Sequence, residues 1–573
     1  MPGTADSHPH RDSVIVVGAG PAGLACALAL ARHGVRTVLV DAGDGTPREG
    51  SRSCGLDAST YGFAVNLVGD RLDGAAQAWG PLRIRRRSTT VPGPRPADAD
   101  GAEADEPPRR YGLSQQRLEA ALLDAVLASP LVTKAWRHRV DAVDQDRDSV
   151  TVTARGPAGE VRWRAAWLVA CDGHRSPVRR AVGVRFPGRP RVDRLLCADV
   201  KVALPRPPWD ESPLEPWLFV DPPFQRDGTV LAQPLPQDMW RLTWQLPLAH
   251  GVAKAADATA LIPVHGDPAD PRRTAQRVRA VLRTLDAMSP DADAAEDPAY
   301  DLVWTGEFEV HQRLARRFRA GRVLLAGDAA HLVHPNVADG VDLALQDARN
   351  LAWKLALVLT RRAPDRLVET YHGERRSAAR RRLAYGEDAL HFLSPRGPAQ
   401  KVGRRLTLMG ARSKGTTLRR LDPRALVAES VPEYAGSPLL TPRAGAAVGA
   451  PAEEISVVRG DGSRATLSAC LDRGLVAVLV APGIEVWDGP RWRDAGLMPG
   501  LRARLGELPF AAELVVTPEY PGAAAHTLLL VRPDGYLAAW LPPGGDEDLT
   551  AVALRAVGRR AQEEAAAPAE VAG

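Results

Sequence analysis

The stretch VIVVGAGPAGLACALALARHGVRTVLVD, residues 14–41, decides the fold of the first part of this chain. An apolar strand over 14–17 runs into a glycine turn, and a helix over 24–34 leads to a second apolar strand that ends at Asp41. Two strands separated by one helix and short turns form a parallel βαβ unit. The sequence therefore predicts an α/β fold that starts near the first residue.

The glycine turn follows the pattern G-x-G-x-x-G and comprises Gly18, Ala19, Gly20, Pro21, Ala22 and Gly23. Glycines at this spacing allow a tight turn and a close approach of the backbone to a pyrophosphate at the helix N-terminus. Asp41 follows about 20 residues later, where a carboxylate can bind a ribose hydroxyl. The order of strand, turn, helix and acid predicts a dinucleotide site. The alternative is a glycine turn that holds no ligand.

The composition excludes several classes of protein. The chain has 573 residues, of which 45% are hydrophobic and 25% are charged, and this is far from the composition of disordered proteins. At about 150 residues per domain, the length predicts three or four domains. Because 74 Lys and Arg against 69 Asp and Glu leave a net charge of only +5, we expect no nucleic-acid partner and no membrane partner.

The cysteine pattern also excludes a disulfide framework and a zinc site. The five cysteines are scattered, without CxxC or Cys/His spacing, so we expect no metal. The N-terminal residues lack a signal-peptide pattern, and no apolar stretch approaches the roughly 18 residues of a membrane span. We therefore expect a cytoplasmic protein. The cysteines are Cys26, Cys54, Cys171, Cys197 and Cys470.

The pattern of strands and helices changes along the chain. Residues 91–108 are rich in Pro and acids and predict a surface loop, whereas residues 114–129 predict a capped helix. From about 186 to 310, runs of Val, Leu and Trp between Pro and Gly turns predict a mainly antiparallel sheet inserted into the first domain. An apolar strand within 321–331 and an amphipathic helix over 342–362 predict the return of that domain.

Two further motifs follow the glycine turn. CDGHRSPVRR, residues 171–180, has the form D-G-x-x-S-x-V-R, and GRVLLAGDAAH, residues 321–331, ends a strand in Gly-Asp before a helix that contains DARNLAWKLA. In this order, with the β-rich insert between the last two, the three motifs resemble the FAD-dependent aromatic hydroxylases, the group A flavoprotein monooxygenases of the para-hydroxybenzoate hydroxylase fold. The resemblance covers about residues 12–400. Residues 48–59 and the C-terminal extension look most like the branch of 3-(3-hydroxyphenyl)propanoate and aromatic polyketide hydroxylases.

The resemblance implies three domains. These are an FAD-binding Rossmann-like domain of the GR2 type, an inserted, mainly antiparallel β-sheet substrate domain, and a C-terminal thioredoxin-like α/β domain. Thioredoxin chemistry needs two thiols at CxxC spacing, and Cys470 stands alone, so the last domain is expected to be structural or oligomer-forming, with a homodimer as one expected state. The predicted boundaries are 1–185 and 311–400 for the FAD domain, 186–310 for the sheet domain, 401–440 for a helical connector and 441–573 for the thioredoxin-like domain.

The resemblance also implies which residues hold FAD. Gly18, Gly20, Gly23 and Asp41 would hold its ADP half, and Arg52 and Gln115 would lie near its ribityl-phosphate region, with a surface position as the alternative for each of the last two. Asp172 and Gly173 would serve both FAD and the passing nicotinamide cofactor, and Asp328 would bind a ribityl hydroxyl. Pro335, Gly340, Val341 and Asp342 belong to the turn that would meet the flavin pyrimidine edge.

That turn departs from the family at Ala338, Asp342 and Ala344, and Asp342 stands where an asparagine is usual. Reduced flavin carries negative charge at this edge, so an ionised carboxylate at about 5 Å would oppose it by about 3 kcal/mol at an effective dielectric constant of about 20. The hypothesis is that Asp342 lowers the flavin potential or weakens FAD retention. The alternatives are that its carboxylate turns away, or that it only favours its own helix N-terminus.

Two other features have weaker interpretations. RIRRR, residues 83–87, could steer an anionic substrate or the phosphate of NADPH, but a basic strand facing solvent is the favoured interpretation. His331 and His334 flank the Gly-Asp motif, and a general-base role is not favoured for either.

The resemblance implies a hydroxylation reaction. NADPH or NADH would reduce FAD, O2 would form a flavin hydroperoxide, and its distal oxygen would attack a phenolic or polyketide-type aromatic substrate. No protein nucleophile is required, so no catalytic residue is predicted; a His or Tyr of the inserted sheet would suit deprotonation of a phenol. The alternatives are Baeyer–Villiger or other oxidative tailoring on the same fold, and a non-catalytic flavoprotein or scaffold, because the turn 336–344 departs from the family.

Overall fold

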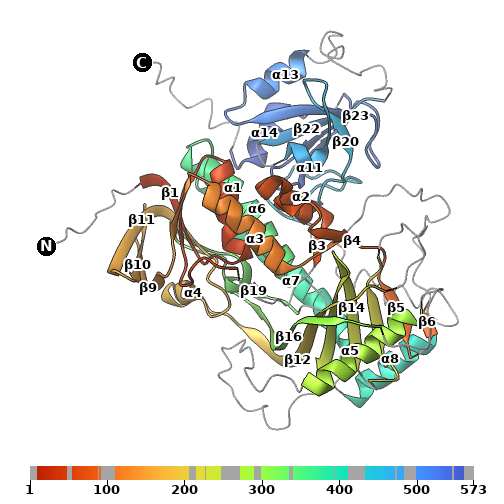
Figure 1. Cartoon of the computed structure of the whole chain (residues 1–573). Helices are drawn as coiled ribbons and strands as arrows, with labels where there is room; N and C mark the ends of the chain where they lie inside the picture. The colour runs from red at the N-terminus through yellow and green to blue at the C-terminus, as the bar shows by residue number, and fades with distance from the viewer. Residues whose placement is uncertain are drawn as a thin grey trace.

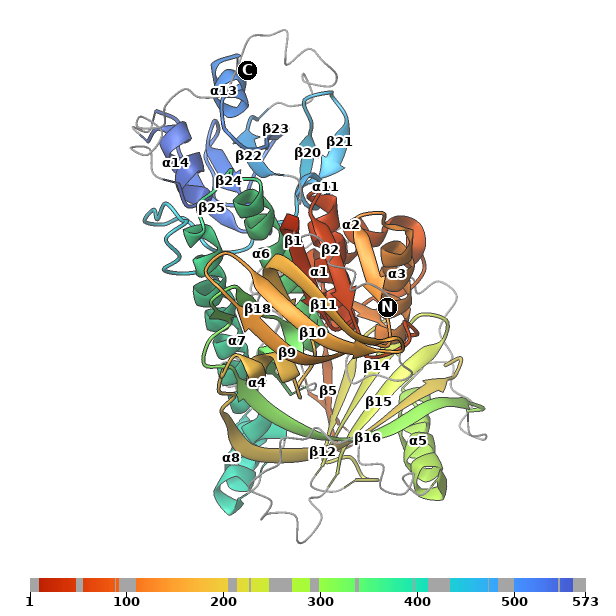
Figure 2. The same cartoon turned by 90° about the vertical axis from the view of Figure 1, so that its left-hand side faces the viewer.

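The computed structural model places three main sheets along the molecule (Figure 1). The C-terminal sheet lies at one end, a second sheet lies at the other, and a largely parallel sheet with its helices lies between them (Figures 1 and 2). The structure describes residues 10–47, 55–87, 89–91, 110–204, 214–225, 228–246, 271–288, 298–334, 340–393, 395, 397–410, 433–471, 474–482, 499–544 and 547–559.

The first sheet contains the predicted βαβ unit, which is confirmed. Its strands follow the order β17-β18-β11-β1-β2-β8, with β10 paired to β11 and β9 to β10. β1 is parallel to both β2 and β11, and β11 is parallel to β18, so the strand ends that carry the sequence motifs meet at one edge. The strands are β1 (His10–Val17), β2 (Arg36–Val40), β8 (Val132–Ala135), β9 (Arg139–Gln145), β10 (Val150–Gly156), β11 (Gly159–Ala170), β17 (Arg319–Ala320) and β18 (Val323–Leu325).

Helices pack beside this sheet, and the predicted helix over 114–129 is confirmed as α3, with Ser114 at its N-cap. The helix predicted over 342–362 is α6 (Gly340–Leu359), but the prediction that it is amphipathic is wrong. Every residue from Asp342 to Ala356 is buried, because α1, α7 and the C-terminal sheet surround the helix. The helices of this region are α1 (Pro21–Arg32), α2 (Ala58–Val68), η1 (Gly69–Leu72), α3 (Gln115–Ala128), α4 (Pro177–Ala181), η2 (Gly327–Ala329) and α7 (Arg366–Leu393).

The second sheet has the order β19-β16-β12-β15-β14-β13-β5-β6 and is antiparallel except for the pair β13 and β5. Side chains alternate clearly in β12 and β15, where every second one, including Ala198, Trp240 and Trp244, packs against α5. The elements are β5 (Arg83–Arg86), β6 (Thr89–Val91), β12 (Gly188–Lys201), β13 (Trp217–Val220), β14 (Thr229–Leu235), β15 (Met239–Leu246), α5 (Pro271–Asp286), β16 (Asp301–Leu314) and β19 (His331–Leu332).

The basic run at 83–87 forms β5, which joins this sheet rather than the first. Arg83 is exposed and donates to Glu215 over 2.8 Å, whereas Ile84 is buried, so the favoured interpretation of a strand with a solvent-facing basic side holds for Arg83. A separate three-stranded sheet of β3 (Gly55–Asp57), β7 (Arg110–Leu113) and β4 (Ala76–Ala78) lies close by. The predicted surface loop over 91–108 falls, after Val91, outside the described residues.

The C-terminal sheet has the order β21-β20-β23-β22-β24-β25. Its Pro533–Asp534–Gly535 turn joins the antiparallel pair β24 and β25, as predicted, and Gly535 has a φ of 84°, which a glycine adopts without strain. The description of this unit as thioredoxin-like stays a prediction. Its elements are β20 (Ser456–Val458), β21 (Arg464–Thr466), α11 (Leu467–Cys470), β22 (Leu475–Val480), α13 (Pro499–Gly506), β23 (Ala512–Thr517), β24 (Leu528–Val531), β25 (Leu537–Leu541) and α14 (Leu549–Ala556).

The predicted domain boundaries stay predictions, but strand pairing crosses two of them. β5 and β6 come from residues before 185 and pair within the second sheet, and β16 continues past 310 to Leu314. Of the predicted connector over 401–440, α8 (Pro398–Gly410) and residues from 433 onward are described. Among the described helices, none combines the length and the apolar character that a bilayer span requires.

Candidate functional site

A cavity of about 690 Å³ lies where the first sheet meets the second. Its walls come from segments that are far apart in the sequence: the glycine turn, the end of β2, the start of β9, the motif at 171–180, β16, and residues within 328–333 and 340–344. The predicted residues Gly18, Gly20, Pro21, Ala22, Asp41, Gln115, Asp172, Gly173, Asp328, Gly340 and Val341 all line it. The fold therefore brings most of the predicted site together.

The glycine turn shapes one end of the cavity. Gly18 has a φ of 102°, and a Cβ there would lie 2.3 Å from the carbonyl oxygen of Cys171. A Cβ on Gly23 would lie 1.7 Å from the carbonyl oxygen of Gly18, so the turn and α1 can approach only through glycines. Gly20 is different, because a Cβ there meets no atom within 4 Å. Gly20 thus leaves open space at the N-terminus of α1, where an anion is favoured.

Asp41 is tied to this turn. Its Oδ2 accepts the backbone N–H of Ala19 over 2.7 Å, and its Oδ1 accepts the N–H of Gly43 over 2.6 Å. Because a carboxylate has about four acceptor positions, two remain for hydroxyl groups of a ligand. The bond to Ala19 fixes the carboxylate beside the open turn, which is the geometry that ribose binding needs.

Asp172 presents an oxygen that the described residues leave unsatisfied. Its Oδ2 accepts the backbone N–H of Val178 over 3.0 Å, whereas its Oδ1 is buried and accepts no hydrogen bond from the described part of the chain. Burial raises the pKa of this carboxyl above its usual range. A buried carboxylate oxygen on a cavity wall is an acceptor position for a ligand hydroxyl.

Gln115 and Glu119 face the same cavity from α3, and Gln115 Nε2 donates to Glu119 Oε1 over 2.6 Å. Gln115 was predicted from the sequence, but Glu119 was not. Three further residues, His138, Arg139 and Val140, were not predicted either; they follow the end of β8 and line the wall near Asp41. A helix spacing of four residues could have suggested Glu119, but no sequence pattern marks His138 to Val140 as part of a site.

The other end of the cavity lies against β16 and the start of α6. Val310 and His311 of β16 line it, and His311 is 4% exposed. Leu332, Val333 and Val341 provide an apolar wall, and Asp328 lies beside Gly340, where a Cβ would come within 4.0 Å of the Asp328 carboxylate. A His or Tyr of the inserted sheet was expected to suit deprotonation of a phenol, and His311 is a histidine of that sheet that lines the cavity.

Asp342 lies in the first turn of α6, but it is not among the described residues that line the cavity. Its carboxylate is instead held by other groups of the protein. Its Oδ1 accepts the backbone N–H of Asp57 over 3.0 Å, and its Oδ2 accepts Gln346 Nε2 over 2.8 Å and lies 3.8 Å from Arg382. Burial, and then the charge of Asp57, raises the pKa of Asp342 to about 7. This geometry favours the alternative in which the carboxylate turns away from the cavity.

The imidazole of His331 also has its polar contact within the protein. Its Nε2 lies 2.7 Å from Asp347 Oδ2, which accepts the backbone N–H of Gly327 as well. Burial alone would raise the pKa of Asp347, but His331 and Arg375 outweigh burial and hold this pKa below its usual range. His331 therefore holds the Gly-Asp motif in place. Arg52, Pro335 and Ala338 lie outside the described residues.

Comparisons with known proteins agree with this architecture. The model of the family described as "FAD binding domain" matches residues 11–384. A 3-(3-hydroxy-phenyl)propionate/3-hydroxycinnamic acid hydroxylase of Mycolicibacterium smegmatis is 30% identical over 392 residues, which cover 68% of this chain and 62% of that protein. The chain thus aligns with less than two thirds of the length of this relative. A 12-dehydrotetracycline 5-monooxygenase/anhydrotetracycline 6-monooxygenase of Streptomyces rimosus is 29% identical over 94% of this chain and 97% of its own.

Solved structures match over nearly the whole chain. CabE, an aromatic hydroxylase from angucycline biosynthesis, is 27% identical with a TM-score of 0.62, and the alignment covers 96% of this chain and 99% of CabE. The flavin-dependent monooxygenase PieE, solved with FAD and substrate, has a TM-score of 0.67 at 22% identity and so supports the fold alone. The cavity joins the glycine turn to two acidic motifs within the matched residues 11–384, and the chain belongs to the FAD binding domain family.

Proposed function

We propose that this protein is an FAD-dependent monooxygenase that uses NADPH or NADH and O2 to hydroxylate a phenolic or polyketide-type aromatic substrate. The observation that carries the proposal is one continuous cavity, which joins the glycine turn at one end to β16 of the second sheet at the other. The activities for which the relatives are named, hydroxylation of hydroxyphenylpropionate and of anhydrotetracycline, support the same substrate class.

The residues of the cavity fit FAD. The open space at Gly20 and the N-terminus of α1 suit its pyrophosphate, Asp41 suits a ribose hydroxyl, and the buried Oδ1 of Asp172 suits another hydroxyl or an N–H group. Asp328 suits a ribityl hydroxyl at the far end. When bound, FAD supplies electron transfer from NADPH or NADH and the activation of O2.

The protein's own contribution is to position the aromatic ring, hold its phenolic proton and exclude water. We assign the proton to His311, because this residue is buried and lines the cavity at the end next to α6, and the imidazole of histidine is a common general base. Val310, Leu332, Val333 and Val341 form the apolar surroundings that keep water from the reacting ring. A cytoplasmic location and a homodimeric state belong to the same proposal.

The test is a comparison of cofactor oxidation with product formation. The purified protein, loaded with FAD, is mixed with NADPH or NADH in the presence and absence of phenolic polycyclic compounds, and oxygenated products are identified by mass spectrometry. Faster cofactor oxidation with one hydroxyl gained per NADPH or NADH consumed supports hydroxylation. Insertion of oxygen into a ring carbon–carbon bond, or bound FAD with no oxygenated product from any compound, contradicts it.

A further inference from the structure

The hairpin of β24 and β25 carries charged side chains into the first domain. Arg532 donates to Glu374 of α7 through two hydrogen bonds of 2.7 and 2.8 Å, and it also bonds Asp534. Asp534 accepts Asn350 Nδ2 of α6 over 2.8 Å. All four side chains are buried. Thus the C-terminal unit contacts α6 and α7 through an ionic cluster that solvent does not reach.

Tyr434 connects this hairpin to Arg375 of α7. Its ring stacks on Tyr536 of the hairpin with centroids 3.8 Å apart and planes 15° apart. Its hydroxyl oxygen accepts Asn350 Nδ2 over 3.1 Å and Arg375 over 3.2 Å. The hairpin therefore positions the ring of Tyr434 through stacking, and the Tyr434 hydroxyl in turn fixes Arg375.

Arg375 in turn fixes the motif that lines the cavity. Its Nε donates to Asp347 Oδ1 over 2.8 Å, and the other oxygen of Asp347 accepts the N–H of Gly327 over 3.0 Å and contacts His331 at 2.7 Å. Gly327 precedes Asp328, which lines the cavity. A continuous set of hydrogen bonds therefore runs from the C-terminal hairpin to the Gly-Asp motif.

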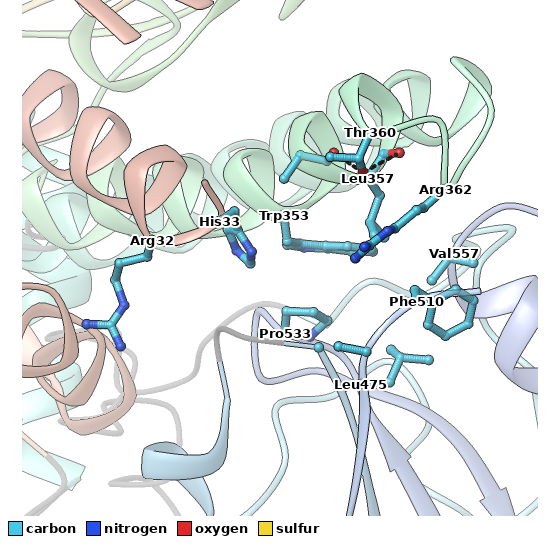
Figure 3. Close-up of a pocket in the computed structure, with 13 residues that line it drawn as sticks. Arg32, His33, Trp353, Leu357, Thr360, Arg362, Leu475, Phe510, Pro533 and Val557 are labelled. Carbon is cyan, nitrogen blue, oxygen red and sulfur yellow. Dashed lines mark hydrogen bonds between the residues drawn. The ribbon is translucent and has the colours of Figure 1, made fainter. Parts of the chain in front are cut away.

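Part of this junction is open. Pro533, which lies between Arg532 and Asp534, faces Trp353 of α6 across a cavity of about 490 Å³ (Figure 3). Leu475 and Phe510 line the side of that cavity that belongs to the C-terminal unit (Figure 3). Because an open space cannot fix the relative position of two units, the polar cluster on the other side of the hairpin helps to fix it, together with contacts such as the hydrogen bond of 3.0 Å from Asn66 Nδ2 to the Ser468 carbonyl oxygen.

The charges of the cluster are also balanced. Three buried acids face three buried bases, and a fully paired buried network holds one arrangement because any other leaves a charge without its partner. The acids are Asp347, Glu374 and Asp534, and the bases are Lys354, Arg375 and Arg532. A small displacement of the hairpin would therefore be passed on to Arg375 and Asp347 rather than absorbed.

We propose that the C-terminal unit acts on the flavin site, with Tyr434 as the positioning residue through which the hairpin sets the Gly-Asp motif via Arg375 and Asp347. This assigns the unit a function other than dithiol chemistry or dimer formation. The inference needs FAD binding only, so it holds or fails independently of the hydroxylation reaction.

The test is Tyr434→Phe, which keeps the stacked ring and removes the acceptor of Arg375. We expect the dissociation constant of FAD to rise about three- to tenfold and the midpoint potential of the bound flavin to shift. The matched control is Tyr520→Phe, which removes a buried hydroxyl that accepts the N–H of Glu453 within the C-terminal unit. The control is expected to lower the unfolding midpoint but to change FAD affinity less than about twofold.

Two results overturn the proposal. One is FAD affinity and potential that match the wild-type protein in the Tyr434→Phe variant. The other is a parallel loss of FAD affinity in both variants, which would trace to stability alone. If Tyr434→Phe does not fold, Tyr536→Phe carries the same test, because it keeps the stacked ring and removes the hydroxyl that hydrogen-bonds Tyr434. Unchanged FAD affinity and potential in Tyr536→Phe then overturn the proposal.

Discussion

The backbone N–H of Asp57 donates a hydrogen bond of 3.0 Å to Oδ1 of Asp342, across 285 positions of the sequence. The bond joins β3 to the first turn of α6, and Arg382 of α7 lies 3.0 Å from Asp57 Oδ2 and 3.8 Å from Asp342 Oδ2. Two buried carboxylates thus share one arginine. Burial, together with their mutual repulsion, explains why the pKa of Asp342 rises to about 7.

Asp342→Asn is expected to change the pH dependence of stability. Between pH 3.8 and about 7 the unfolded chain releases the Asp342 proton and the folded protein keeps it, so the wild-type free energy of unfolding falls as pH rises in this window. The variant lacks this loss and gains stability relative to wild type, by at most about 1.4 kcal/mol per pH unit. Urea unfolding at several pH values measures the difference.

Asp44→Asn is the control of opposite sign. A hydrogen bond from the Thr46 hydroxyl lowers the pKa of Asp44, so its contribution to stability is lost as pH falls, and no gain toward pH 7 is expected. Because the Asp342 carboxylate is held by Asp57 and Gln346, we also expect little change of flavin potential in Asp342→Asn. A large rise in potential would restore the hypothesis that Asp342 acts on the flavin.

Gly20→Ala and Gly23→Ala are expected to separate FAD binding from folding. A methyl group at Gly20 meets open cavity and an extended backbone, so the variant should fold normally and bind FAD at least about tenfold more weakly. At Gly23 the methyl would lie 1.7 Å from the Gly18 carbonyl oxygen, so the fold itself should be destabilised. FAD fluorescence titration and thermal unfolding distinguish the two; normal FAD affinity in Gly20→Ala would contradict the site.

His311→Gln is expected to lower kcat/KM for a phenolic substrate about 100-fold and to remove the acidic limb of its pH profile. FAD affinity should stay the same, because His311 lies at the end of the cavity that belongs to the second sheet. His138→Gln, at the Asp41 end, is the comparison variant and should weaken FAD binding without a change in the pH profile. Identical pH profiles for His311→Gln and the wild-type enzyme would rule out the assigned role.

Glu374→Gln is expected to cost about 3–5 kcal/mol of unfolding free energy, because it leaves Lys354 buried without its ion-pair partner and leaves Arg532 with Asp534 alone. Burial alone would raise the pKa of Glu374, but these two cations outweigh burial and hold it far below its usual range. Glu160→Gln breaks an exposed pair with Arg162 and should cost less than about 1 kcal/mol. Chemical denaturation measures both; equal small losses would contradict the ionic cluster.

Local patterns predicted the first sheet because the relevant physics is local. Each part of this motif interacts with the glycine turn beside it. The structure contains the apolar strand before Gly18, the helix after the turn, and the hydrogen bond between Asp41 and the turn. The same holds for the Pro533–Asp534–Gly535 hairpin. The placement of Asp172 and Asp328 in one cavity followed from the resemblance to a family, since a long stretch of sequence that includes β12 to β16 separates them.

Features that depend on distant partners were not predictable. Periodicity predicted an amphipathic α6, but the C-terminal unit covers the face that carries Asn350 and Lys354, so the polar side chains there are buried in pairs. His311 looks like any polar residue of a strand until β16 is placed against the cavity. The orientation of Asp342 depends on Asp57 and Arg382, whose proximity no sequence spacing reveals.

The pairing of β5 with β13 has a consequence for how the chain reaches its fold. β5 emerges from the ribosome long before Trp217–Val220 exists, so its edge stays without that partner while the intervening strands are made. Such non-local parallel pairing folds slowly and exposes a strand edge to other chains. A truncated protein that ends after β11 would keep that exposed edge permanently, so aggregation is expected in addition to the loss of the cavity residues that follow β11.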